Sequence, residues 1–409
     1  MSCDNRGPKV PLLKACCLSP LMPGSEFPRL YNKVFIQFAL ANLFNVSSFG
    51  IFFIFPLYIR SLGGSEADIG IIMGSLALSS VLCRPWISEM IDRLGRKRSY
   101  SIGSLTMAVV PLGYMFLRGD IGKIYGPLIL FRLIHGVGLA ICFTASFTYI
   151  ADVLPRERIN EGIGMFGATG LAGLAIGPVI GEMVARKFGF PYFFIAGAGF
   201  GAVGFVLHLP MPESYRPRGL SQGKSFFGLM AERKIFVVAV LAFLFGLGLA
   251  ASGNFVAPYA KDKGISVVSV YYIFYSLSAI STRLLGGRIA DKVGEQRVIP
   301  YALVITGVGL FMLVFLGGYG ILIIAGVLAG CGHGFLFPCL NALVIRDEPV
   351  EIRGKVTGIF TGGIDAGSFL GSIFLGYIGQ VCGYRILFLT SGFALLAGLY
   401  IYLKRLGSE

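Results

Sequence analysis

Long apolar stretches recur along the whole chain, and short segments rich in charge, glycine or proline separate them. A helix needs about 20 apolar residues to cross a bilayer, and these stretches lack the short polar and apolar alternation of a transmembrane β-barrel. The pattern therefore predicts an all-α polytopic membrane protein with twelve transmembrane helices. We expect them at residues 33–60, 66–91, 98–117, 123–151, 158–185, 190–209, 234–260, 266–290, 297–317, 319–346, 353–381 and 384–404.

The composition agrees with this pattern, because 55% of the 409 residues are hydrophobic and only 14% are charged. The formal net charge of +14 would suggest a nucleic-acid partner for a soluble protein. On the predicted helices, however, 23 of the 35 Lys and Arg residues lie on the side of the N-terminus, eight lie opposite and four lie within helices. This positive-inside bias explains the charge without nucleic acid. It predicts a protein of the cytoplasmic (inner) membrane, embedded in lipid, with both termini in the cytoplasm.

The hydrophilic segment PESYRPRGLSQGKS, at 212–225, divides the chain, and the sequence repeats across it. Such a duplication predicts two pseudo-symmetric six-helix bundles with the substrate site between them, near mid-membrane. At a constant offset of 199 residues, the matches are Arg84 with Arg283, Asp92 with Asp291, Gly95 with Gly294 and Arg98 with Arg297, and His135-Gly136 matches His333-Gly334 at an offset of 198. The predicted organisation is a cytoplasmic tail (1–32), the first bundle (33–211), a cytoplasmic linker (212–233), the second bundle (234–405) and a C-terminal tail (406–409).

Three segments carry motifs in a fixed order. Ser88, Asp92, Arg93, Gly95, Arg96 and Lys97 are similar to G-x3-D-R-x-G-R-K, with Ser88 in place of the first glycine. The 123–151 helix contains Arg132-x2-His135-Gly136-x-Gly138-x-Ala140, similar to R-x2-Q-G-x-G-x-A. The 158–185 helix contains Gly164-x8-Gly173-x3-Gly177-Pro178-x2-Gly181-Glu182, similar to G-x8-G-x3-G-P-x2-G-G except at Glu182. Over about residues 30–405, the chain thus resembles the major facilitator superfamily of transporters.

The resemblance implies transport by alternating access, and the third motif is similar to that of the drug and metabolite:proton antiporters. It also implies a monomer whose partners are a small-molecule substrate and protons. In the family, the aspartate at Asp92 is taken to latch its loop against a helix of the other half and to hold the outward-facing state. The alternative is a solvated loop whose charges only set the topology. The predicted latch comprises Asp92, Arg93, Gly95, Arg96, Lys97, Asp291, Gly294 and Arg297.

Ionisable residues inside the predicted helices are the candidates for proton coupling. Arg132 lies nine residues beyond Lys123, roughly 14 Å into its helix, and Asp365 is also expected near mid-membrane. A charge at that depth is costly unless it is paired or faces a water-filled cavity. The alternative for Arg132 is a structural role, hydrogen bonding to backbone carbonyls. The predicted coupling set is Asp365, His333, His135 and Arg132, with His333 and Asp365 as a possible pair.

Four other charged residues are given no role in the site. Arg84 and Arg283 lie nearer the inner ends of their helices, where we expect their guanidinium groups to snorkel to the interface or to pair with loops. Glu182 and Asp152 lie close to helix ends, where we expect ordinary solvation.

The 158–185 helix carries a stripe of small residues, and such stripes let membrane helices approach closely. Its members are Gly164, Gly173, Gly177 and Gly181, and Pro178 permits a bend. We expect the stripe to pack on the second half, against the 353–381 helix, which has glycines of its own. The alternatives are a lipid-facing surface or close packing within the first half.

The sequence contains no nucleophile–base set, metal-ligand cluster or phosphate-binding loop. It therefore predicts no enzymatic activity, no metal and no cofactor. The predicted function is proton-coupled efflux of a small amphipathic or cationic organic compound. The alternatives are proton-coupled uptake of a nutrient or metabolite and, remotely, a membrane scaffold or enzyme. The candidates for lining the substrate cavity are Asn45, Arg132, Asn254, Asn341 and Asp365.

Overall fold

The computed structural model of the protein describes residues 32–154, 159–214, 226–349 and 352–406, and within these all regular structure is helical. The predicted all-α membrane class is therefore confirmed. The first-half helices are α1 (Lys33–Ile51), α2 (Phe55–Ser61), α3 (Glu66–Leu94), α4 (Arg96–Gly113), α5 (Ile121–Val153), α6 (Ile159–Phe188) and α7 (Phe190–His208). The second-half helices are α8 (Phe226–Met230), α9 (Arg233–Ala250), α10 (Val256–Asp262), α11 (Ser269–Val293), α12 (Glu295–Met312), α13 (Tyr319–Ile345) and α14 (Arg353–Arg405).

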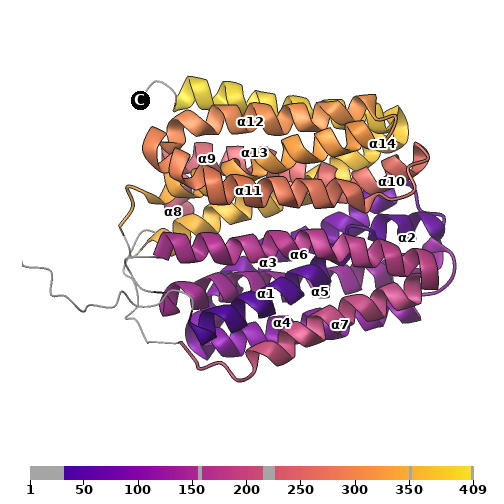
Figure 1. The fold of residues 1–409 in the computed structure, drawn as a ribbon, viewed down its shortest axis with the longest axis horizontal. Helices are drawn as coiled ribbons and strands as arrows, with labels where there is room; N and C mark the ends of the chain where they lie inside the picture. Colours follow the sequence, from indigo (N-terminus) through magenta and orange to yellow (C-terminus); the bar gives the residue numbers. More distant parts are fainter. Residues whose placement is uncertain (1–31, 155–158, 215–225, 350–351, 407–409) are drawn as a thin grey trace, which may run out of the picture.

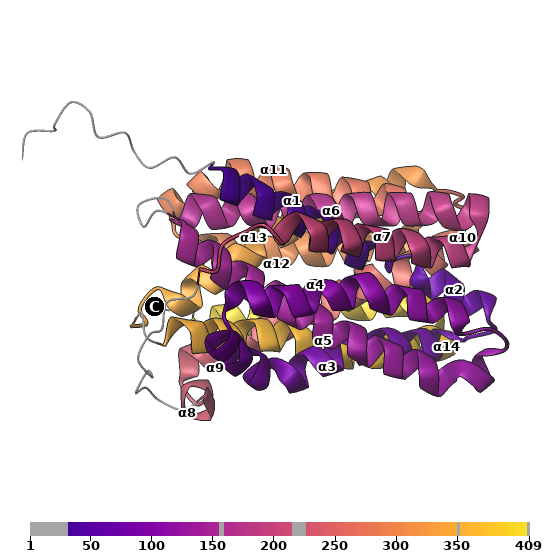
Figure 2. The same cartoon turned by 90° about the horizontal axis from the view of Figure 1, so that it is seen from below.

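The long helices run side by side along one axis of the molecule (Figure 1). The first-half helices, indigo to magenta, occupy one layer, and the second-half helices, orange to yellow, occupy the other. Two pairs of long helices join the layers, α3 with α14 and α6 with α11 (Figure 2), and the short helices α2 and α10 also meet. Because α3 and α11 carry the repeated Arg84 and Arg283, both of these arginines lie on helices that face the opposite half.

Nine helical stretches of the described residues are long and apolar enough to cross a membrane. The last stretch, α14, contains Gly383 with φ of +82°, so two helical segments meet there. Helix α4 lies among the others without meeting the same measure of length and apolarity, and α11 is not counted because the side chains of residues 286–289 lie outside the described part of the chain. The number of transmembrane helices stays a prediction of twelve. Most of the predicted linker, residues 215–225, lies outside the described part of the chain.

The two ends of the bundle differ in what they carry. One end, called here the Asp92 end, holds the connection between α3 and α4 together with the start of α1 and the end of α14 (Figure 1). The opposite end, called here the Arg60 end, holds α2 and α10 (Figures 1 and 2). These names describe the molecule without assigning either end to a side of a membrane.

The glycine stripe of α6 packs on α1, within the first half, and not on the second half. A Cβ added at Gly173 would lie 2.8 Å from the Leu43 carbonyl oxygen, and one at Gly177 would lie 2.5 Å from that of Ser47. The expected packing against the 353–381 helix is therefore wrong, and the alternative of packing within the half is correct. On α14, Gly363 likewise packs on α9, so small residues bring equivalent helices together in each half.

Candidate functional site

A cavity of about 340 Å³ lies between the two halves. Its walls are mostly apolar and come from both halves, including α1, α3, α5 and α6 on one side and α11, α13 and α14 on the other. Among the described residues, four charged side chains line it: Arg84, Arg132, Arg283 and Asp365. Ligand sites of this kind combine apolar walls with a few polar groups that fix orientation.

Two breaks in helical structure lie at equivalent places along the walls of this cavity. Residues 52–54 separate α1 from α2, and the π-helical turn Ala251–Phe255 separates α9 from α10. Phe53 and Ser252, which line the cavity, are again 199 residues apart. Discontinuous helices in corresponding positions of two repeats are typical of transporter binding sites, and π-turns are frequent at functional sites.

Arg84 and Asp365 form an ion pair across the cavity, from α3 to α14. The Ser80 hydroxyl donates to the same oxygen, Oδ2 of Asp365, at 2.7 Å. Arg84 also donates from a second terminal nitrogen to Thr361 Oγ1 at 2.8 Å. We expected Arg84 to snorkel to the interface or to pair with a loop, but it instead neutralises Asp365, the one carboxylate among the described residues of the lining.

Arg132 of α5 is almost completely buried, with 1% of its surface exposed, and it lines the cavity. It has no ion pair with a described residue, and its Nε and one terminal nitrogen have no hydrogen-bond partner. The uncharged Tyr114 phenol lies beside the guanidinium group and is its polar neighbour. His135, one turn further on, is fully buried, and the centroid of its ring lies 4.7 Å from that of Phe52. It is not among the described residues that line the cavity.

His333 and Asp365, which we considered as a pair, have different partners. Nδ1 of His333 shares a hydrogen bond with the Tyr275 hydroxyl, and its ring contacts the Phe245 ring at a centroid distance of 5.1 Å. Both His333 and Tyr275 line the cavity, as Asp365 does. The candidate coupling residues therefore share one cavity, except for His135, without forming one hydrogen-bonded chain.

The three asparagine candidates divide between the cavity and the protein interior. Asn254 lines the cavity and donates to Ser372 Oγ at 2.7 Å. Asn45 lies outside that lining, because its amide group binds within the first half, donating to the Tyr100 hydroxyl at 2.8 Å. Asn341 also lies outside it, and its side-chain oxygen has no hydrogen-bond partner among the described residues.

Contacts between the halves close the Arg60 end of the cavity. Arg60 of α2 donates to Oδ1 of Asp262, on α10, at 2.6 Å. The Tyr384 hydroxyl of α14 donates to Oε1 of Glu66, on α3, at 3.1 Å. Close backbone packing accompanies these contacts, since a Cβ at Gly376 would lie 2.7 Å from the Glu66 carbonyl oxygen.

Glu182, the residue that departs from the third motif, is the most buried carboxylate of this closure, with 3% of its surface exposed. Its two oxygens accept the backbone N–H groups of Val268 and Ser269, at 2.9 and 2.7 Å, where α11 begins. Lys261 Nζ lies 3.8 Å from the same carboxylate. The expected solvation of Glu182 is therefore wrong: this first-half carboxylate binds the N-terminus of a second-half helix, where a negative charge is stabilised.

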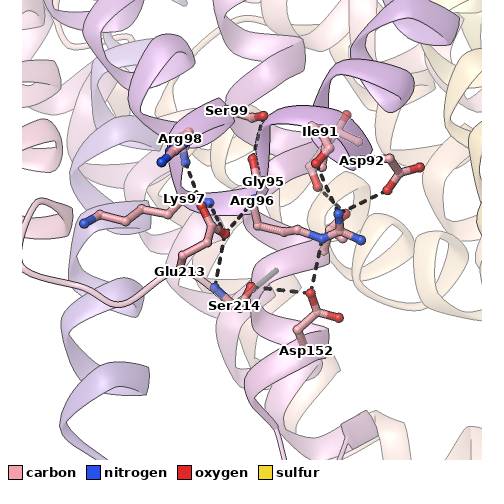
Figure 3. A network of polar contacts seen from close by, with 12 residues as sticks. Ile91, Asp92, Gly95, Arg96, Lys97, Arg98, Ser99, Asp152, Glu213 and Ser214 are labelled. Atoms are coloured by element: carbon pink, nitrogen blue, oxygen red, sulfur yellow. Dashed lines mark hydrogen bonds and ion pairs between the residues drawn. The ribbon is translucent and has the colours of Figure 1, made fainter. Parts of the chain in front are cut away.

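The connection between α3 and α4 is bound to its own half (Figure 3). Arg96, which is buried, pairs with Asp92 Oδ1 at 3.1 Å and with Asp152 Oδ2 at 3.2 Å. Glu213 accepts the backbone N–H groups of Arg96 and Lys97 at 2.8 and 3.0 Å. Asp152 is thus paired, where we expected solvation. Arg93 pairs only with Glu89 of its own helix, and Gly95 supplies the turn with φ of +98°.

The repeated loop of the second half also has a buried charged residue paired within its own half, but the buried residue is acidic instead of basic. Glu295, which matches Arg96 at the offset of 199, is buried and pairs with Arg346 at 2.5 Å. Gly294 makes the turn with φ of +90°, and Arg297 is exposed. The side chain of Asp291 lies outside the described residues. The described ion pairs at this end therefore each join residues of one half.

Sequence reasoning did not identify Arg84, Arg283 or Glu182 as part of the site. The repeat marked Arg84 and Arg283 as matching residues, but only the fold shows that both face the opposite half. Glu182 had a signal as well, because it stands where the motif has glycine, and a carboxylate at that point must find partners.

Comparisons with known proteins agree with this architecture. The chain is 26% identical over 393 residues to the quinolone resistance protein NorA of Staphylococcus aureus (strain MSSA476), covering 91% of this chain and 95% of NorA. It is 24% identical over 374 residues to the uncharacterized MFS-type transporter MJ1560 of Methanocaldococcus jannaschii, covering 87% and 94%. A crystal structure of the nucleoside transporter NupG has the same fold, with a TM-score of 0.70, 16% identity and coverage of 91% and 99%. The family model described as Major Facilitator Superfamily matches residues 38–347 and 238–408, so this chain belongs to that superfamily, whose members are membrane transporters and not enzymes.

Proposed function

We propose that this protein is a secondary active transporter that exports a small amphipathic organic compound in exchange for protons. The observation that carries the proposal is the apolar cavity between the halves, crossed by the Arg84–Asp365 ion pair. The names of relatives support export: NorA is described as a quinolone resistance protein. The mostly apolar walls suit an amphipathic compound better than a sugar, which needs many hydrogen bonds.

In this proposal the protein is a monomer of the cytoplasmic (inner) membrane, and the Asp92 end faces the cytoplasm with both termini. The structure then corresponds to the state closed toward the outside, because Arg60, Glu66 and Glu182 join the halves at the opposite end. Export requires these contacts to break and the Asp92 end to close, with the latch loop moving from its own half to the other. Rocking of two halves about a fixed central site is the expected motion.

Asp365 is the proposed proton carrier. Its carboxylate lies in the membrane-spanning part of α14 and is accompanied by a single cation, Arg84. Protonation would remove the negative charge and weaken the link between α3 and α14, whereas release of the proton would restore the link. A ligand or proton shifts a conformational equilibrium only through different affinities for the two states. The ion pair supplies such a difference if it exists in only one of them.

The test is transport by the full-length protein in proteoliposomes under an imposed pH gradient, with a panel of cationic drugs, organic acids, sugars and amino-acid-like compounds. If the protein exports its substrate in exchange for protons, a compound should accumulate in the direction opposite to proton flow. Collapsing the pH gradient should stop this accumulation. Movement together with protons would replace the proposal by the alternative, uptake by symport. Absence of gradient-dependent movement for every compound would overturn proton-coupled transport altogether.

A further inference from the structure

In the described part of the cavity wall there are three arginines, and one of them has a counter-ion there. Arg84 is neutralised by Asp365, whereas Arg132 and Arg283 have no ion pair with a described residue, and the polar neighbour of Arg132 is the uncharged phenol of Tyr114. With one carboxylate against three guanidinium groups, the described lining carries a formal excess of two positive charges. Guanidinium groups do not lose their charge in proteins, and an unpaired charge among apolar walls is costly.

Arg283 stands out because its repeat partner is satisfied. Arg84 reaches from α3 across to α14, where it meets Asp365. Arg283 reaches from α11 toward α6, where a Cβ added at Gly167 would lie 2.8 Å from its terminal nitrogen. The facing stretch of α6, residues 162–181, contains no acidic residue. The second arginine of the repeat is therefore presented to the cavity over a glycine, without the carboxylate that neutralises the first.

Aromatic rings surround the two unpaired guanidinium groups. The Arg283 guanidinium lies 5.4 Å from the Phe337 ring centroid, and that of Arg132 lies 5.7 and 5.5 Å from the Phe52 and Phe55 rings. Such contacts stabilise a cation in part but leave its N–H donors unused. A planar oxyanion uses those donors, because carboxylate and guanidinium groups match in a two-pronged geometry.

We propose that the cavity selects organic anions, with the carboxylate group bound by Arg283 and the apolar body against Phe337 and the neighbouring walls. This inference rests on the proposed transport function and narrows its substrate class. It excludes the cationic compounds that the sequence-based prediction of an amphipathic or cationic substrate allowed, since a cation would meet two unpaired positive charges. Exchange of one such monoanion for one proton also moves net charge, so a membrane potential that is negative inside accelerates export.

The test is binding of three tritiated compounds with one naphthalene body to the purified full-length protein: 2-naphthoate, 2-naphthamide and 2-naphthylmethylammonium. We expect the acid to bind about tenfold or more tightly than the amide, as a charge-assisted hydrogen bond implies, and the ammonium to bind most weakly. Arg283→Gln should remove the preference for the acid, because it weakens binding of the acid more than binding of the amide. Arg283→Lys should retain part of the preference. Lys292→Gln, an exposed change on the same helix, is the matched control and should leave all three affinities unchanged.

Equal affinity for acid and amide in the wild-type protein would overturn the inference, and this comparison needs no variant to fold. An unchanged preference in Arg283→Gln would overturn the role of Arg283. The proposed function fails separately. If neutral or cationic compounds are exported against protons while the acid is not preferred, transport stands and anion selection falls. If the acid binds through Arg283 but no compound moves with the gradient, anion selection stands and proton-coupled export falls.

Discussion

Arg84 and Asp365 are 281 residues apart in the chain and form an ion pair inside the membrane-spanning bundle. The pair joins α3 to α14, the same helices whose backbones pack closely toward the Arg60 end. A charge that controls a contact between the halves, and that protonation can remove, is a means of coupling a proton to a change of conformation.

Asp365→Asn should abolish proton-driven transport while sparing substrate binding and exchange down a gradient. Asparagine keeps an oxygen for the donors of Ser80 and Arg84 but cannot carry the proton. The measurement compares pH-driven uptake with substrate exchange in the same proteoliposomes. Ser80→Ala is the control, because it removes a hydrogen bond and leaves the carboxylate in place. Wild-type coupling in Asp365→Asn would exclude this carboxylate as the proton carrier.

Removing one partner of the ion pair should cost more than removing both. Arg84→Gln leaves a carboxylate in an apolar cavity, and we expect a loss of about 1–3 kcal/mol because the pair is partly exposed to the cavity. Adding Asp365→Asn to Arg84→Gln should restore much of that loss. The readout is the thermal midpoint of the purified proteins in a double-mutant cycle. Additive losses would mean that the two side chains do not interact.

Glu182→Ala should open the Arg60 end. The substitution removes two charge-assisted hydrogen bonds to the start of α11, a loss of about 1.5–3 kcal/mol. The population open at that end should therefore rise about tenfold or more. In a cysteine-free background, a cysteine at Ser252, in the cavity wall, reports this through faster labelling by an impermeant maleimide added from that side. Lys187→Gln, an exposed change on the same helix, should leave the labelling rate unaltered, and an equal rate in Glu182→Ala would remove Glu182 from the closure.

Asp92→Asn tests the predicted latch. Among the described residues, Asp92 pairs with Arg96 of its own half and is largely exposed, as a latch released from the other half would be. If the latch forms in the opposite state, the variant should transport more slowly and favour the state closed at the Arg60 end. The same labelling at position 252 measures this population. Unchanged transport and unchanged labelling in this variant would mean that Asp92 is no latch and that the charges of the loop only set the topology.

The helical class and the family were predictable because both rest on local patterns, apolar runs and three motifs. The residues with which a charged side chain pairs across the bundle could not be predicted in this way. Nothing near Arg84 in the sequence indicates that its charge meets Asp365 rather than the interface, and the place of Glu182 near a helix end suggested water. The glycine stripe predicted close packing correctly but not its partner. A row of small residues fits any helix that approaches it, and here that helix is α1.

Gly177→Val should impair folding more than transport, because the stripe is packed within one half. The new Cβ would lie 2.5 Å from the Ser47 carbonyl oxygen and 2.6 Å from the Ile51 backbone nitrogen. Neither backbone atom can move aside as a side chain can, so α1 must shift, and overpacking of this kind costs about 1–3 kcal/mol. Gly164→Ala is the control on the same helix, since no described atom beyond the neighbouring residues of that helix lies within 4 Å of its added Cβ. We expect a lower thermal midpoint and lower yield for Gly177→Val, with near-normal transport per folded molecule. The reverse result, a wild-type midpoint with slow transport, would mean that α6 slides on α1 during the cycle and that this contact belongs to the moving parts.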